Sequence, residues 1–251
     1  MSDGATGVFA YQSPTSYWEG RRVDPIGTLD LPEGDEKVPV MLILHGSGGP
    51  GYRDSSWSRF FLERGIGTFR IDYFKPRGIS VGRRFTPAAL PAPIQDVQGA
   101  IAFLKTHPRI DADRMGLIGF SRGGNMALSS MRLKEYELSG VTLKLFIALY
   151  PSCGIATVDR RTSTEQALII IGTEDDFGSA SACLELTKQG EALGKSIETL
   201  VLDGATHGFD RGRAVTVRTG QGSITMIPDA GHTATARARV EALAVEVLGR
   251  P

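Results

Sequence analysis

Along the chain, short apolar runs alternate with longer stretches in which apolar residues recur at helical spacing. Six runs rich in Val, Ile, Leu and Phe end at Gly, Pro or Asp, which predicts strands at residues 38–46, 67–74, 115–120, 143–151, 167–172 and 197–204. Helical spacing predicts helices at residues 57–64, 94–106, 125–133, 179–193 and 234–248. Because the strands lack strict alternation, we expect both of their faces to be buried, as in a parallel sheet. The pattern predicts an α/β fold, with a mostly parallel central sheet and helices on both faces.

Two segments depart from this alternation of predicted strands and helices. Residues 76–93 are too rich in Pro and Gly for either element, so we predict a long loop near the functional site. Residues 214–227 alternate apolar and polar positions around two glycines, which is typical of a hairpin. No repeat or linker divides the sequence, and we expect one domain over residues 1–251, with an N-terminal extension at 1–25.

Charge and composition exclude some partners. The 28 basic and 28 acidic residues cancel, so no global field attracts nucleic acid or an anionic membrane, and we expect neither as a partner. The first twenty residues have no basic segment followed by a long apolar one, which predicts a cytoplasmic protein unless a leader has been removed.

Cys153 and Cys183 are too few for a disulfide framework, and we expect them to be reduced and packed.

The stretch GFSRGG carries the first candidate chemistry. Gly119, Ser121 and Gly123 form the pattern G-x-S-x-G between a predicted strand and a predicted helix, the context of a nucleophile elbow. Small residues on either side let the strand and the helix approach while the Ser takes a strained conformation. A glycine-rich turn in which the Ser only caps the helix is the alternative.

A second glycine-rich turn follows the strand at residues 38–46. A nucleophilic Ser needs two donors for the oxyanion, and we expect the backbone N–H groups of Arg122 and Ser47, with Gly46 or Gly48 as alternatives to Ser47. His45 begins this turn, where we expect it to hold the loop in place; it is also a candidate contact for substrate.

Later strand ends supply a base and an acid. His207 lies in a loop after one strand, and Asp175 and Asp176 follow another, in the chain order Ser, Asp, His of the α/β-hydrolase scaffold. Only one of the adjacent carboxylates can point at His207. We expect His107 at the surface, and keep His232 as a rival base.

Together these motifs carry a resemblance. LHGSGG, DYFKPRG, GFSRGG, IIIGTEDD and ATHGFD, in this order, resemble the dienelactone hydrolase family of α/β-hydrolases, from about Val38 to the last helix. The resemblance implies an α/β-hydrolase fold, with Asp175 as the acid and His207 as the base. In that family the corresponding motif is G-x-C-x-G, with Cys where this chain has Ser121. This difference favours a more general esterase over a dienelactone hydrolase in the strict sense.

These observations predict a serine hydrolase that cleaves small carboxylic esters or lactones, with no metal or organic cofactor. Alternatives are an amidase, peptidase or acyltransferase on the same triad, or a ligand-binding homologue without turnover. Arg77, with Arg83, Arg84 and Arg122, is a candidate clamp for a substrate carboxylate, the alternative being a solvated loop. The sequence carries no signal for an oligomeric state.

Overall fold

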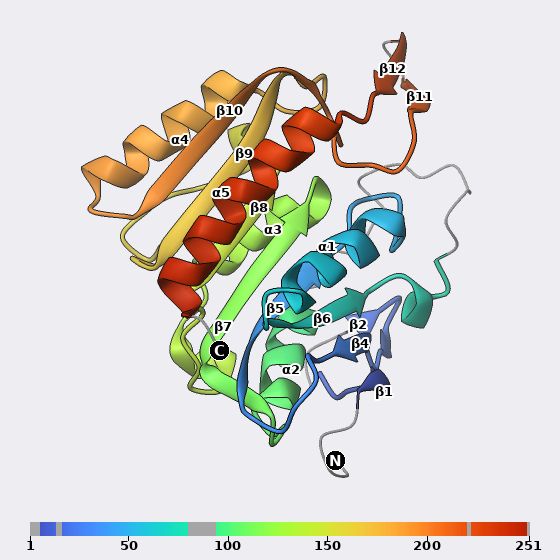
Figure 1. Ribbon diagram of the computed structural model, residues 1–251, viewed down its shortest axis with the longest axis vertical. Helices are drawn as coiled ribbons and strands as arrows, with labels where there is room; N and C mark the ends of the chain where they lie inside the picture. Colours follow the sequence, from blue (N-terminus) through green and yellow to red (C-terminus); the bar gives the residue numbers. More distant parts are fainter. Residues whose placement is uncertain (1–5, 14–16, 80–93, 220–221, 250–251) are drawn as a thin grey trace.

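An eight-stranded sheet runs through the centre of the molecule (Figure 1). The computed structural model describes residues 6–13, 17–79, 94–219 and 222–249. In spatial order the strands are β1 (Gly7–Ala10), β4 (Ile26–Asp30), β6 (Gly67–Asp72), β5 (Val38–Leu44), β7 (Ile110–Phe120), β8 (Leu145–Leu149), β9 (Gln166–Glu174) and β10 (Ile197–Thr206). From β6 to β10 all neighbours are parallel, and only the β1–β4 and β4–β6 pairs are antiparallel. The mostly parallel sheet that the sequence predicts is therefore confirmed.

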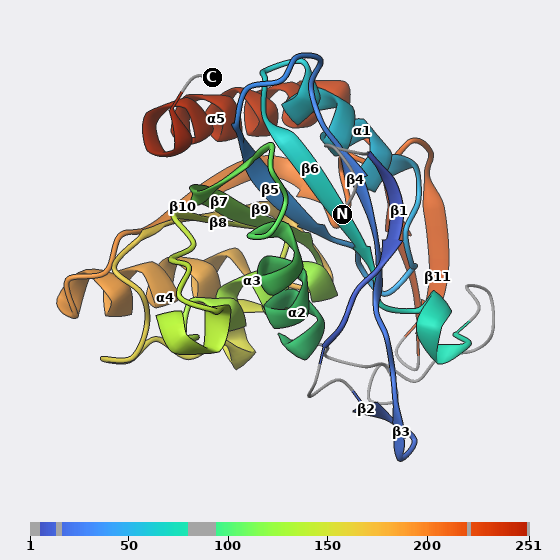
Figure 2. The same cartoon turned by 90° about the horizontal axis from the view of Figure 1, so that it is seen from below.

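Helices cover both faces of this sheet (Figures 1 and 2). On one face lie α1 (Tyr52–Leu62) and α5 (Ala230–Leu248), and on the other lie α2 (Ile94–Leu104), α3 (Arg122–Ser130) and α4 (Ala180–Ala192). Each face has its own apolar core: Trp57, Phe61 and Val240 pack on the first, and Val97, Ile101 and Leu186 on the second. Burial on both faces explains why the strands read as apolar runs without alternation.

Each predicted strand and helix has a counterpart, with ends that shift by a few residues. Helix α1 begins five residues earlier than its apolar spacing indicates, because the Asp54 carboxylate accepts a hydrogen bond of 2.9 Å from the N–H of Gly51 and caps the helix there. Helix α5 begins at Ala230, where Asp229 accepts from the N–H of His232 at 2.7 Å. Polar capping residues set both helix starts, so the hydrophobic pattern alone misses them.

The N-terminal segment contributes β1 to the central sheet, and its two other short strands pair with each other in a separate sheet. Strand β1 pairs with β4, and β4 with β6, so they form the antiparallel edge of the sheet, which the sequence did not predict. The predicted hairpin is present as β11 (Val215–Thr219) and β12 (Gly222–Met226), which projects from the body in Figure 1. The remaining short elements are β2 (Tyr17–Trp18), β3 (Arg21–Arg22), η1 (Lys75–Arg77), η3 (Glu135–Leu138) and η4 (Cys153–Ile155). Of the predicted loop at 76–93, residues 80–93 lie outside the described residues.

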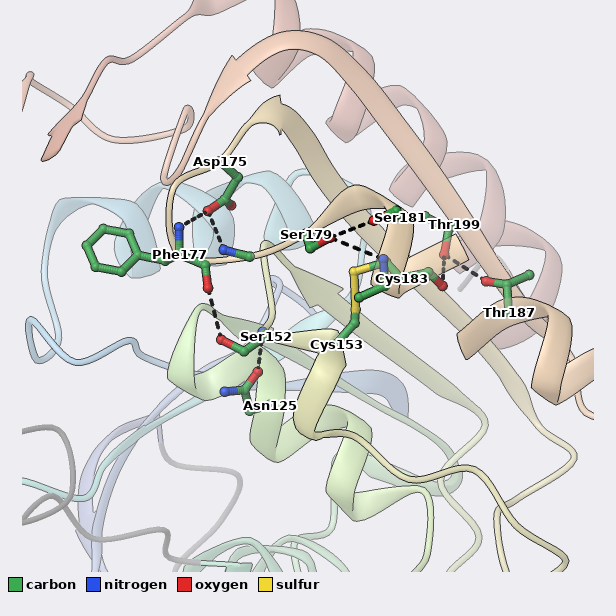
Figure 3. The surroundings of a disulfide bond; sticks show 12 residues. Asn125, Ser152, Cys153, Asp175, Phe177, Ser179, Ser181, Cys183, Thr187 and Thr199 are labelled. Atoms are coloured by element: carbon green, nitrogen blue, oxygen red, sulfur yellow. Dashed lines mark hydrogen bonds between the residues drawn. A yellow bond between two sulfur atoms is a disulfide. The ribbon is translucent and has the colours of Figure 1, made fainter. Parts of the chain in front are cut away.

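The two cysteines form a disulfide, so the expectation of reduced cysteines is wrong (Figure 3). Cys153 lies just after β8, and Cys183 is in the first turn of α4, after β9. Since β8 and β9 are parallel neighbours, their carboxyl ends lie side by side, which brings the two Cα atoms within 5.0 Å. That separation suits a disulfide, and it depends on strand order, which residue spacing does not reveal.

We expect this disulfide to stabilise the fold measurably. It closes a loop between residues 30 apart in sequence, for which the chain-entropy account gives about 3–4 kcal/mol. A Cys153→Ala/Cys183→Ala double variant should therefore lose about 2–4 kcal/mol in its free energy of unfolding, measured by urea titration. Dithiothreitol should destabilise the parent protein and leave the double variant unchanged. Equal stability of parent and variant under oxidising conditions would contradict this role.

Candidate active site

Ser121 occupies a tight turn between β7 and α3. Its φ of +55° lies in the left-handed region that L-residues rarely adopt. A Cβ on Gly119 would lie 2.0 Å from the carbonyl oxygen of Gly123, and a Cβ on Gly123 would lie 2.2 Å from that of Leu44. Both glycines are therefore required by close backbone approach, and the strain at Ser121 is the result of strand and helix meeting without side chains between them.

The side chain of Ser121 does not cap the helix that it begins. Its hydroxyl makes no capping hydrogen bond, and its Oγ lies 2.9 Å from Nε2 of His207. The backbone N–H of Ser121 donates to the carbonyl of Leu149 at 2.9 Å, which fixes the turn against the end of β8. The alternative of a capping Ser is therefore not what the geometry supports.

Asp175 lies on the other side of His207. Its Oδ1 and Oδ2 are 3.0 and 2.9 Å from Nδ1 of His207, and its side chain is fully buried. Oδ1 also accepts from the backbone N–H groups of Phe177 and Gly178, each at 2.8 Å (Figure 3). Asp176, by contrast, is exposed. Of the two adjacent carboxylates, Asp175 is the one that the chain turns toward the imidazole and holds there.

The glycine-rich turn after β5 lies against Ser121. A Cβ on Gly46 would be 3.5 Å from Cβ of Ser121 and 3.1 Å from the carbonyl oxygen of Phe120. Ser47 follows in this turn, and Arg122 is the first residue of α3, directly after Ser121. Of the two residues expected to supply N–H groups to an oxyanion, Arg122 thus adjoins Ser121 in the chain and Ser47 adjoins Gly46, which lies against it.

The other three histidines lie elsewhere. His45 is almost fully buried, with Nδ1 2.8 Å from the carbonyl oxygen of Gly46 and its ring stacked on Tyr73 at 3.7 Å. Burial lowers the pKa of His45 to about 4, so the imidazole is neutral. Its packing agrees with the expected role of holding the loop, and a contact with substrate stays a prediction. His107 is buried and not at the surface, and accepts from the N–H of Arg109. The Nε2 atom of His232 lies 2.9 Å from the carbonyl of Asp203.

Arg77 is a second correction. Its guanidinium makes a bidentate contact with Asp96, at 2.7 and 2.9 Å, and both side chains are almost fully buried. This contact joins η1 to α2. The guanidinium also donates to the backbone carbonyl of Tyr73. Such a desolvated pair is a structural link and leaves Arg77 engaged away from substrate. Arg83 and Arg84 lie outside the described residues.

Four further residues surround the triad that sequence analysis did not single out. The rings of Tyr150 and Phe177 lie 4.7 and 4.8 Å from that of His207, on a buried and an exposed side respectively. Beneath them, Arg53 donates to the hydroxyl of Tyr150, which donates to Asp210 at 2.7 Å. Tyr150 and Asp210 could have been noticed, since Tyr150 lies in the last residues of one predicted strand, in LYP, and Asp210 follows another, in HGFD.

A pocket of about 510 Å³ opens beside this site. Its walls come from the glycine-rich turn, the start of α1 and the segment after His207, and include Gly48, Gly49, Arg53, Arg211 and Arg213. Burial lowers the pKa of Arg211, whose side chain is partly buried. No carboxylate forms a salt bridge with Arg211 or Arg213 among the residues that the structure describes. The pocket thus has three arginines and one carboxylate, that of Asp54, among its lining residues at the glycine-rich turn.

Neither a metal centre nor a membrane helix is found in the described ranges. No three His, Cys, Asp or Glu side chains gather there in an arrangement that could hold a metal ion. Nor does any helix in those ranges have the length and apolar character needed to cross a membrane.

Solved structures with the same fold are α/β-hydrolases. MGS-M1, an α/β-hydrolase enzyme from a Medee basin deep-sea metagenome library, matches with a TM-score of 0.68 at 20% identity, over 98% of this chain and 99% of that one. Esterase 2 of Thermogutta terrifontis in its apo form matches with a TM-score of 0.71 at 17% identity, over 98% and 96%. At such low identities the likeness establishes the α/β-hydrolase fold and no more.

Curated relatives are similar over part of the sequence. A probable 2-oxo-3-(5-oxofuran-2-ylidene)propanoate lactonase from Bradyrhizobium is 27% identical over 129 residues, which are 46% of this chain and 48% of the relative. Hydrolase 3 from Catharanthus roseus is 29% identical over 189 residues, which are 66% of this chain and 56% of the relative. The chain thus spans about half the length of the curated relatives that it matches.

A family comparison covers the larger part of the chain. The model of the dienelactone hydrolase family matches residues 80–247, which include all three residues of the candidate triad. The resemblance that the sequence motifs carry is thereby confirmed: this chain belongs to the dienelactone hydrolase family.

Proposed function

We propose that the protein hydrolyses carboxylic esters or lactones through an acyl-enzyme, with Ser121 as the nucleophile, His207 as the base and Asp175 as the acid that orients it. The observation that carries this proposal is the 2.9 Å contact between Oγ of Ser121 and Nε2 of His207, at a strained turn with Asp175 behind the imidazole. Membership of the dienelactone hydrolase family supports a hydrolase.

The proposed reaction has two stages. Oγ of Ser121 attacks the ester carbonyl while Nε2 of His207 takes its proton, and the N–H groups of Arg122 and Ser47 stabilise the oxyanion. The C–O bond to the leaving group then breaks, and His207 returns the proton to the alcohol oxygen, leaving an acyl-enzyme. Water, deprotonated by His207, attacks this ester and releases the carboxylic acid and Ser121. For a lactone, the alcohol and the acid are the two ends of one product.

We expect Ser121→Ala to lower kcat for a p-nitrophenyl ester by at least about 10⁴-fold, because no nucleophile remains. Ser129→Ala is the matched control, since Ser129 is an exposed serine on the same helix, and its kcat should stay within about twofold of the parent value. A fluorophosphonate probe should label the parent and the control, and leave the Ser121 variant unlabelled. Full turnover by Ser121→Ala would end the assignment of the nucleophile, and a parent protein that is neither labelled nor active would favour a ligand-binding homologue.

We further propose that the substrate carries a carboxylate near its ester or lactone bond. Three arginines, Arg53, Arg211 and Arg213, line the pocket at the glycine-rich turn. The Asp54 carboxylate lines it too, so basic side chains outnumber acidic ones in the described lining. The Bradyrhizobium relative is named for an anionic lactone, which agrees with this charge. The proposed contact for such a group is Arg211, which lies four residues after His207 and whose side chain lies beside Gly208.

We expect Arg211→Gln to discriminate between matched substrates by charge. Its kcat/KM for p-nitrophenyl hemisuccinate should fall roughly 10–100-fold, the loss of a charge-assisted contact, while that for p-nitrophenyl acetate should change by less than about threefold. Arg218→Gln removes the same charge from an exposed position on β11 outside the pocket, and should affect both substrates equally. An equal loss for both substrates in Arg211→Gln would refute the proposed contact.

The compartment is a separate matter. A cytoplasmic location stays a prediction from the N-terminal residues, and the Cys153–Cys183 disulfide counts against it, because such bonds persist mainly in oxidising compartments.

A further inference from the structure

A group of buried polar side chains lies directly beneath His207. Arg53 and Trp57 come from α1, Tyr150 follows β8, and Asp210 lies three residues after His207. The Tyr150 hydroxyl accepts from Arg53 at 3.2 Å and donates to Oδ1 of Asp210 at 2.7 Å, and Nε1 of Trp57 donates to Oδ2 of Asp210 at 2.7 Å. Both oxygens of the Asp210 carboxylate thus have a partner.

The charges in this group balance each other in a buried place. The four side chains are less than a tenth exposed. Burial alone would lower the pKa of Arg53, but Tyr150, Asp54 and Asp210 raise it overall, so its cation is held. Burial raises the pKa of Tyr150, so its hydroxyl keeps its proton and can donate to Asp210. Such a desolvated network costs more to break than an exposed one, and so resists movement.

Tyr150 also touches the catalytic imidazole. Its ring meets that of His207 edge-on, with centroids 4.7 Å apart and an interplanar angle of 63°. Its φ of +43° is one of the few positive values among non-glycine residues in the described ranges, and its N–H donates to the carbonyl of Ile170. Such a backbone conformation is unfavourable for a tyrosine, so surrounding contacts must hold it. The hydroxyl bond to Asp210 is one such contact.

From these contacts we infer that Tyr150 and Asp210 are positioning residues for His207, an inference that rests on the proposed hydrolase function. Asp210 anchors the segment 207–210 to α1 through Trp57 and Arg53, and the ring of Tyr150 fixes the plane of the imidazole. The ring of Phe177 also lies against the imidazole, with centroids 4.8 Å apart. His207 is thereby limited to the orientation in which Nδ1 meets Asp175 and Nε2 meets Ser121. The group acts through His207 and does not itself contact substrate.

Tyr150→Phe tests this inference, because it keeps the aromatic ring and removes only the hydroxyl. We expect kcat for a p-nitrophenyl ester to fall roughly tenfold, the factor that corresponds to the loss of one buried hydrogen bond, while KM stays within about twofold. The rate of labelling by a fluorophosphonate should fall by a similar factor. The low-field proton NMR signal expected for the His207–Asp175 hydrogen bond should broaden or disappear.

Tyr11→Phe is the matched control. Tyr11 is also buried and its hydroxyl donates to a carbonyl, that of Asp96, at 3.0 Å, but it packs beside Phe69 and Phe103, in the core that α2 covers. This variant should lose stability and keep the parent kcat, labelling rate and NMR signal. If Tyr150→Phe does not fold, Asp210→Asn serves instead, because it keeps the shape and removes the charge opposite Arg53, and the same three changes are expected.

The possible outcomes are separable. If the parent protein is labelled at Ser121 but Tyr150→Phe matches Tyr11→Phe in kcat, labelling rate and NMR signal, the positioning role is wrong and the hydrolase proposal stands. The same result for a folded Asp210→Asn variant would be equally decisive. If the parent protein is not labelled at all, the hydrolase proposal fails, and the inference fails with it.

Discussion

The contact between strand β7 and helix α3 is the constraint on which the site depends. Carbonyl oxygens of Gly123 and Leu44 lie where side chains at residues 119 and 123 would begin, so the backbone can close this turn only with glycine at both places. Closing it forces Ser121 to a φ of +55°, which turns its Oγ toward His207 instead of toward the end of its own helix. The orientation of the hydroxyl is therefore a property of backbone packing.

The parallel strand order brings the other residues to this turn. Strands β7, β8, β9 and β10 are successive neighbours, so the segments after their carboxyl ends meet at one edge of the sheet. Ser121, Tyr150, Asp175 and His207 come from those four ends in that order. The disulfide joins two of the same segments, after β8 and β9, and Ser152 beside it donates to the carbonyl of Phe177 (Figure 3). The loop that holds Asp175 is thus tied to the segment that carries Tyr150.

The features that could be predicted from the sequence are those that depend on a short local motif. Strand ends followed by GFSRGG, GTEDD and ATHGF indicate three residues that the fold brings within hydrogen-bond distance, since each motif sits on one element. It missed features that need two distant segments at once. Arg77 in a loop looks available to a ligand, and only the packing of η1 on α2 pairs it with Asp96. Likewise, Cys153 and Cys183 meet only because β8 and β9 are neighbours.

Arg77 differs from the arginines of the pocket in how its charge is neutralised. Arg77 meets a single carboxylate bidentately, so its charge is neutralised within the protein and contributes no field to a ligand. The charge of Arg53 is balanced by Asp54 and Asp210, whereas Arg211 and Arg213 have no salt bridge within the described ranges. The positive charge along the pocket wall therefore comes from these last two arginines. The anionic substrate proposed above would neutralise this remaining positive charge. The same Asp210 that keeps Arg53 ionised would then hold the base in place, so that one network sets both the charge of the pocket and the geometry of His207.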